Sequence, residues 1–298
     1  MTSRSHLPWI ATAGLVVLAA CSPSSEAAPA NDPIQATLAS VGAAASRAVD
    51  DEVVETGAVT DEFAVFDASV VHAFSIEFDE SDYDSMIETF AATGDKEWIS
   101  ATVTIDGVTY EQVGVRLKGN SSLFGLTAET AANPEDLPWL IRLNEFVDGV
   151  DHQGYEEFVI RSNSTETAMN EAVAQELLAL AGIAAQAPIA TAFTVNGGEP
   201  ELRLAVAHPD EEWYDDHFDD PDGLLYKADS EGDYSYRGDD IDAYVDVFDQ
   251  KVGDDDMTPL IDFLDFINNA DDATFAAEIG DRLDVDAFAP SLAMQDLL

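Results

Sequence analysis

Residues Trp98–Leu117, WISATVTIDGVTYEQVGVRL, contain the strongest local folding signal in the chain. Two runs rich in β-forming residues, Trp98–Ile105 and Val108–Leu117, lie on either side of Asp106-Gly107. An Asp-Gly pair between alternating apolar residues is typical of a two-residue hairpin turn, because both turn positions adopt a positive φ angle. The stretch therefore predicts two antiparallel strands joined by a tight turn.

Apolar periodicity predicts the elements on both sides of this hairpin. Further strands are predicted at Val70–Phe78, Trp139–Leu143, Tyr155–Arg161, Ala190–Val195, Leu202–Ala207 and Leu224–Ala228. Helices are predicted at Ser81–Phe90, Ala168–Ala181, Tyr244–Phe248, Met257–Ile267, Thr274–Leu283 and Asp286–Leu298. One face of the helix at Ala168–Ala181 carries Met169, Val173, Leu177 and Leu180. Strands early in the chain and helices late predict an α+β fold with a mainly antiparallel sheet.

The composition excludes several classes of protein. With 298 residues, of which 46% are hydrophobic, the chain is long and apolar enough to form a sizeable core. The 60 Asp and Glu residues outnumber the 12 Lys and Arg residues, which gives a formal net charge of -48. So acidic a surface repels nucleic acid, and we expect no nucleic-acid partner. A single Cys leaves no intrachain disulfide and no cysteine-based metal site.

The N-terminus has the pattern of an export signal. An apolar run at Trp9–Leu18, too short to span a bilayer, leads into Leu18-Ala19-Ala20-Cys21. This looks like the lipobox of bacterial lipoproteins, which predicts residues 1–21 as a lipoprotein signal peptide with lipidation at Cys21. An ordinary signal peptide with an incidental cysteine is the alternative. Residues 22–60 are rich in Ala, Ser, Pro and acids and are predicted as a flexible tether before a domain at 61–298.

In so acidic a chain the rare cations are the informative residues. Arg116, Lys118, Arg142 and Arg161 lie in or just after predicted strands, and Arg116 and Lys118 share one strand face. Lys118 is followed by Gly119-Asn120-Ser121-Ser122, in which the glycine permits close backbone approach and the Asn120 and Ser121 side chains offer hydrogen bonds. Together these residues could hold a phosphorylated ligand. The alternative is a sheet face on which the cations pair with neighbouring carboxylates.

Val113–Ser122, VGVRLKGNSS, resembles the "vRxKGnSS" signature of the CotH kinase family, which is named for a spore-coat protein. Segments that resemble further parts of the family pattern follow in the family's order: Pro138–Leu143, Thr167–Glu171, Leu224–Ala228 and Leu283–Phe288. The resemblance covers the chain from about Val70 to its last residue. The resemblance implies an atypical protein-kinase-like fold. It also implies an enzyme that transfers the γ-phosphoryl group of ATP to Ser or Thr and uses a divalent metal such as Mg²⁺.

The resemblance also suggests roles for individual residues. Arg116 and Lys118 match the family's basic strand and are candidates for contact with the ATP phosphates. Glu171 matches a helix acid that could pair with Lys118, and Lys227 is a further candidate near the nucleotide.

The chain departs from the family pattern after Leu283–Phe288. The family's catalytic and metal-binding acids lie beyond that point, and no segment here matches them, so the catalytic residues are not assigned and no metal ligand is predicted. We expect a C-terminally incomplete domain with little or no phosphotransfer. The alternative is a non-catalytic cell-surface assembly or adhesion lipoprotein on the same scaffold.

The remaining acidic and histidine residues give no site. The acids between Asp210 and Asp256 do not fit an EF-hand and are predicted as a solvated surface, and the histidines show no metal-ligand spacing. The expected partners are a membrane, reached through the lipid, and an unidentified protein that is a substrate or an assembly partner. The expected location is the cell envelope.

Overall fold

The computed structural model describes residues 64–162, 167–229 and 232–297. The predicted signal peptide, Cys21 and the whole predicted tether lie outside these residues. The described chain is a mixed α and β structure with strands early and helices late, as predicted.

Seven strands close into a barrel in the order β1-β2-β3-β4-β5-β7-β6. They are β1 (His72–Phe78), β2 (Ile99–Ile105), β3 (Val108–Leu117), β4 (Trp139–Arg142), β5 (Glu157–Ile160), β6 (Pro188–Val195) and β7 (Glu201–Ala207). β1 and β6 pair in parallel and close the barrel, whereas the other neighbours pair antiparallel. A mainly antiparallel sheet was the prediction. Its closure was not predicted, because it depends on a long-range pairing between β1 and β6.

The turn at Asp106-Gly107 lies where the sequence predicts it. Asp106 and Gly107 have φ angles of 47° and 88°, and Ile105 pairs with Val108 across the turn. Asn196 and Gly197 also have positive φ angles, and they begin the longer connection between β6 and β7. Positive φ at both central positions matches the right-handed twist of the strands that they join.

Apolar side chains that alternate along the strands fill the barrel. Interior positions include Phe74, Val103, Val115, Trp139, Phe158 and Phe193, all of which are buried. A smaller apolar cluster of Leu140, Val159, Leu204 and Val206 lies on the opposite face of β4, β5 and β7. Successive strand residues point to opposite faces, so these two clusters show which face of each strand is outside.

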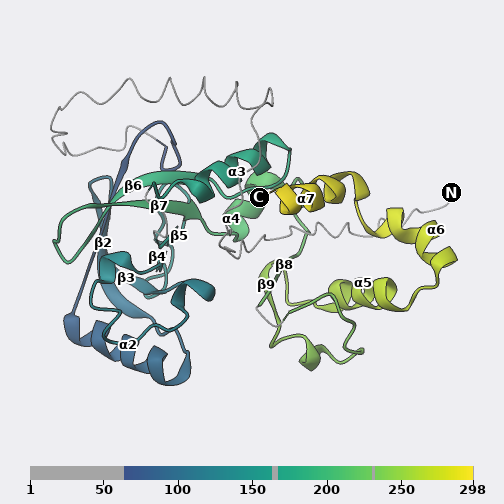
Figure 1. Ribbon diagram of the computed structural model, residues 1–298, viewed down its shortest axis with the longest axis horizontal. Helices are drawn as coiled ribbons and strands as arrows, with labels where there is room; N and C mark the ends of the chain where they lie inside the picture. The colour runs from purple at the N-terminus through teal and green to yellow at the C-terminus, as the bar shows by residue number, and fades with distance from the viewer. Residues whose placement is uncertain (1–63, 163–166, 230–231, 298) are drawn as a thin grey trace, which may run out of the picture.

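The helices and a second small sheet complete the fold (Figure 1). The α-helices are α2 (Glu80–Thr93), α3 (Asn170–Leu180), α4 (Glu211–His217), α5 (Thr258–Asn269), α6 (Asp272–Arg282) and α7 (Val285–Leu297). Short 3-10 turns are η1 (Ser121–Leu123), η2 (Pro134–Asp136) and η3 (Ile241–Ala243), and the second sheet pairs β8 (Leu225–Ala228) with β9 (Phe248–Val252). Figure 1 shows the barrel on one side and β8, β9, α5 and α6 on the other.

An apolar cluster joins the barrel to the β8–β9 hairpin. It contains Ala207 at the end of β7, Trp213 and Tyr214 of α4, Leu225 of β8 and Val252 of β9. The hairpin is therefore fixed relative to β7 through α4.

None of the helices in the described part of the chain has both the length and the apolar content to cross a bilayer.

The helix predicted at Tyr244–Phe248 is wrong. This segment leaves the η3 turn and enters β9 at Phe248. Tyr244 is fully buried, and its hydroxyl donates to the carbonyl of Gly238 and accepts from the amide of Arg237. These tertiary contacts outweigh the weak local helical preference of five residues.

The face of α3 that packs is not the one that carries Met169, Val173, Leu177 and Leu180. Val173 is 57% exposed and Leu180 is 76% exposed, whereas Ala174 and Leu178 are buried. The helix therefore packs through the face that carries Glu171, Ala174 and Leu178. Ala172 packs against the outer apolar cluster of β4, β5 and β7.

Candidate functional site

Strand alternation places several charged residues on the outer face of the barrel. Val115 and Leu117 of β3 fill the interior, so Arg116 and Lys118 point outward. On β4 and β5, Arg142 and Glu157 are paired neighbours on the same outer face. The prediction that these cations share a sheet face is thus confirmed.

All four lysines of the chain meet beside this face. Lys96 precedes β2 and Lys118 follows β3, while Lys227 and Lys251 belong to β8 and β9 of the second sheet. Their charges are close enough to act on one another and on Arg116: Lys227 and Arg116 both lower the pKa of Lys96 and of Lys118, and Lys251 lowers the pKa of Lys227. The barrel and the hairpin therefore bring together five cations from four separate stretches of sequence.

Three of these lysines have no carboxylate partner in the described part of the chain. Lys251 lies 3.0 Å from Asp249, but no carboxylate oxygen lies within 4.0 Å of the amino groups of Lys96, Lys118 or Lys227 among the described residues. In a chain with 60 acidic residues this cannot follow from a shortage of partners. Asp229 and Asp249 act on these lysines only from a longer distance. Like charges gathered with so few direct ion pairs indicate a site for an anion.

Arg116 is held in place by an aromatic ring. Its guanidinium carbon lies 4.6 Å from the ring centre of Trp98, and that of Arg142 lies 5.0 Å from the same ring. The Nε atom of Arg116 is buried and has no hydrogen-bond partner in the described chain. A buried unpaired donor costs free energy, and an anion oxygen would satisfy it. The fit to a phosphate group is therefore good at Arg116.

Lys118 contacts a histidine that the sequence did not mark as functional. Lys118 Nζ lies 2.9 Å from His208 Nε2, and His208 Nδ1 lies 2.6 Å from Glu157 Oε2. The second contact lies off the N–H direction, so it is a close polar contact without an aligned hydrogen bond. The other carboxylate oxygen of Glu157 accepts a hydrogen bond from Arg142. The result is a chain of contacts from Arg142 through Glu157 and His208 to Lys118.

Burial and charge shift the pKa values along this chain. Burial, with the charges of Lys227 and Arg116, lowers the pKa of Lys118 to about 7. Burial also lowers the pKa of His208 to about 4, so this imidazole is neutral at pH 7. Burial opposes the charge of Glu157, but its contacts with His208 and Arg142 outweigh that effect and hold its pKa at about 2.

Glu171 does not pair with Lys118, which corrects the pairing suggested by the resemblance. Glu171 Oε1 lies 2.6 Å from a terminal nitrogen of Arg161, which follows β5 directly. The reason is the orientation of α3, whose packed face carries Glu171 toward the end of β5. Lys118 is already held by His208.

The loop after Lys118 is exposed. Asn120 and Ser121 lie at the surface, and the Asn120 side chain makes no capping hydrogen bond to η1. Gly119 has a φ angle of 113°, and a Cβ atom there would lie 2.2 Å from Ser122 Oγ. Only glycine fits this conformation without strain. The structure therefore places the loop beside the cationic cluster without assigning a contact to Asn120 or Ser121.

A model of the family described as CotH kinase protein matches residues 115–298, which is more than half of the chain. The chain belongs to the CotH kinase family. Comparison with curated proteins gives no match. The family match begins inside β3, one residue before Arg116, and includes the VRLKGNSS segment.

The CotH family implies a divalent metal, and one group of residues in the described chain has ligand atoms close together. The group is Glu157, His208 and Asp210, whose ligand atoms lie within 4.8 Å of one another. Arg142 and Lys118 already contact Glu157 and His208, and Mg²⁺ prefers oxygen ligands to imidazole. These residues therefore do not fit the metal that the family implies.

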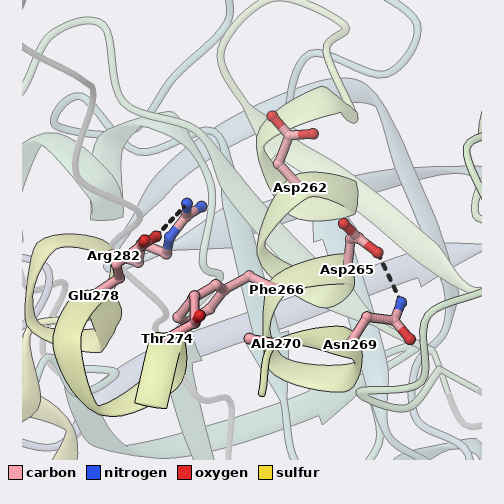
Figure 2. A pocket seen from close by; sticks show the side chains of 8 residues that line it. All are labelled: Asp262, Asp265, Phe266, Asn269, Ala270, Thr274, Glu278 and Arg282. Carbon is pink, nitrogen blue, oxygen red and sulfur yellow. Dashed lines mark hydrogen bonds and ion pairs between the residues drawn. The ribbon is translucent and has the colours of Figure 1, made fainter. Parts of the chain in front are cut away.

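A groove of about 450 Å³ in this CotH domain lies between α5 and α6, apart from the lysines. Figure 2 shows Phe266 on α5 pointing toward α6, which carries Glu278 and Arg282, while Asp262 and Asp265 lie farther along α5. The one cation that lines it pairs with Glu278 at 3.1 Å and stacks on Phe266. The groove is thus acidic overall and unsuited to phosphate.

The prediction of a solvated acidic surface between Asp210 and Asp256 is confirmed in part. Asp215 and Asp239 are exposed, whereas Asp210 and Asp249 are partly buried.

Sequence reasoning missed Lys96, Lys251, Glu157 and His208. The two lysines had a usable signal, because the chain has only four lysines and scarcity alone would have singled them out. Glu157 and His208 had none, since acids are abundant and the histidine has no motif around it. Their roles depend on strand pairing between β4, β5 and β7.

Proposed function

We propose that this CotH family member binds ATP with its phosphates among the four lysines and Arg116. The observation that carries the proposal is the meeting of all four lysines, three without a carboxylate partner, in a chain of net charge -48. The buried, unpartnered Nε of Arg116 supports it. A triphosphate supplies several negative oxygens to such a site, and charge-assisted hydrogen bonds are the strong ones.

We further propose that the bound nucleotide is a phosphoryl donor to a Ser or Thr hydroxyl of an exported or surface protein, on a kinase-like scaffold. In this reaction the bond between the β,γ-bridging oxygen and the γ-phosphorus breaks, and ADP leaves. The acceptor oxygen bonds to that phosphorus, and the hydroxyl proton is released to solvent. Protein kinases orient the phosphates with an ion pair between a strand cation and a helix glutamate. In this chain Glu171 on α3 pairs with Arg161 beside β5 and not with a lysine of the cluster.

The test of nucleotide binding is calorimetric titration of the full chain with ATP, in low and in high salt. Arg116→Gln and Lys227→Met should each weaken binding about 10-fold to 100-fold, since each removes one charged contact. Arg282→Gln is the matched control, because Arg282 pairs with Glu278 on α6 and should leave the affinity unchanged. Equal affinity in all three variants would refute the site.

Phosphoryl transfer needs its own assay. The full chain is incubated with ATP labelled in the γ-phosphoryl group and with proteins released from a bacterial envelope. Label on protein serine or threonine supports the kinase function. ATP binding without any label supports the alternative, a surface assembly or adhesion lipoprotein on the same scaffold.

We also propose that lipidation of Cys21 anchors the protein in the cell envelope. The support is the Leu18-Ala19-Ala20-Cys21 pattern after a short apolar run. Metabolic labelling with a fatty acid tests it. Label in the wild type that is lost in Cys21→Ser supports the anchor, and label that persists in the variant refutes it.

A further inference from the structure

The contact partner of Lys118 is unusual. A buried lysine ordinarily pairs with a carboxylate, yet here a neutral imidazole lies between Lys118 and the nearest buried acid, Glu157. Lys118 Nζ touches His208 Nε2 at 2.9 Å, and Glu157 lies on the far side of the ring, 2.6 Å from Nδ1. Both His208 and Glu157 are more than nine-tenths buried.

The tautomer of His208 follows from its two neighbours. A carboxylate oxygen only accepts hydrogen bonds, so an unprotonated Nδ1 would place two lone pairs 2.6 Å apart. The neutral ring therefore carries its proton on Nδ1, and Nε2 presents a lone pair to Lys118. Lys118 donates one N–H to that lone pair, whichever protonation state its amino group has.

We propose that His208 is a positioning residue that keeps Lys118 apart from Glu157. Because of this separation, Lys118 takes up one proton when an anion binds in the lysine cluster. The inference rests on the proposed function, because the anion is the phosphate group of the nucleotide. A carboxylate in place of the imidazole would hold Lys118 permanently charged and would compete with the phosphate.

The charges around Lys118 come from four strands. Arg116 on β3, Lys227 on β8 and Lys251 on β9 oppose its charge, whereas Glu157 on β5 and Asp249 on β9 favour it. Cations outnumber acids in this set, so the free site disfavours the ammonium form. A phosphate group reverses the balance and favours protonation of the amino group.

Calorimetry of the full chain with ATP at pH 8 measures the proton uptake, from the heats in two buffers with different ionisation enthalpies. ATP is almost fully ionised at this pH, so the uptake reports on the protein. We expect about one proton per ATP and an affinity that falls about tenfold per pH unit above pH 8. Lys118→Met should abolish the uptake.

Variants of His208 separate a positioning role from a purely structural one. His208→Gln keeps a neutral acceptor for Lys118 and should retain the uptake. His208→Glu charges Lys118 in advance, so the uptake should fall to near zero and the dissociation constant should rise about tenfold. ATP binding without proton uptake by the wild type, or full uptake by His208→Glu, would overturn the inference and leave the proposed function standing.

Labelling of amino groups with acetic anhydride between pH 6 and pH 10 provides a readout that needs no ATP. Lys118 of the free chain should react with a midpoint near pH 7, and the midpoint should rise in a folded His208→Glu. If ATP does not bind at all, the proposed function fails and the inference fails with it. A Lys118 midpoint near pH 10 would overturn it, even where His208→Glu does not fold.

Discussion

Replacing Lys118 with Met should alter the pH dependence of folding stability in a defined way. Methionine keeps most of the apolar stem and removes the amino group that lies among Arg116, Lys227 and Lys251. In the folded wild type the pKa of Lys118 is about 7, against an ordinary value of 10.5. The unfolded chain therefore binds one more proton than the folded chain between these two pH values.

Proton linkage determines the direction in which stability changes with pH. Because the folded-state pKa of this base is depressed, the stability of the wild type rises as pH increases from about 7 to 10.5. Below pH 7 the cost of burying a protonated Lys118 reaches its full value, and it lowers the free energy of unfolding by at most about 5 kcal/mol. Lys118→Met removes this penalty and also loses the hydrogen bond to His208, which costs about 1 kcal/mol at any pH in this range.

The net effect of Lys118→Met is therefore a stability gain of up to about 4 kcal/mol near pH 7 that disappears toward pH 10. Urea unfolding, followed by tryptophan fluorescence at pH 6, 7, 8, 9 and 10, measures the difference in unfolding free energy between variant and wild type. Arg282→Met is the control, since its ion pair with Glu278 lies on α6 and should show no such trend. A difference that does not change with pH would refute the electrostatic description of the lysine cluster.

Three further predictions concern the scaffold around the site. Glu171→Gln should cost less than about 1 kcal/mol in urea unfolding, because the arginine pair that it breaks is about one-third exposed on each side; a loss above 3 kcal/mol would show a buried network instead. Gly119→Ala should cost about 1 to 2 kcal/mol and weaken ATP binding in the same titration, since its φ angle is 113° and the new Cβ would strike Ser122; an unchanged melting temperature would contradict that backbone conformation. Leu178→Ala should cost about 2 to 4 kcal/mol, whereas Leu177→Ala should change stability by less than about 0.5 kcal/mol, because only the first side chain is buried; the reverse order would show that the other face of α3 packs.

Local sequence was sufficient for most elements of the fold. The Asp106-Gly107 turn and the strands around it need only residues next to one another, because positive φ angles and alternation are local properties. Most predicted helices and strands lie within a few residues of the observed ones for the same reason. The exceptions are segments without a strong period, such as the one at Tyr244, whose structure follows from burial of its ring and hydroxyl.

The sequence alone also determined the family and the importance of the rare cations. Arg116, Lys118 and Lys227 stand out in a chain with 12 cations and 60 acids, and the VRLKGNSS segment lies within the region that matches the CotH family. Tertiary structure alone decided which cations meet. Lys96, Lys118, Lys227 and Lys251 come from distant parts of the chain, and only barrel closure and docking of the β8–β9 hairpin bring them together. Likewise the partner of Lys118 is His208 and not Glu171. Pairing of β5 with β7 places His208 beside Lys118, and the orientation of α3 places Glu171 beside Arg161. Long-range strand pairing and helix orientation depend on the summed burial of many side chains, which no local pattern encodes.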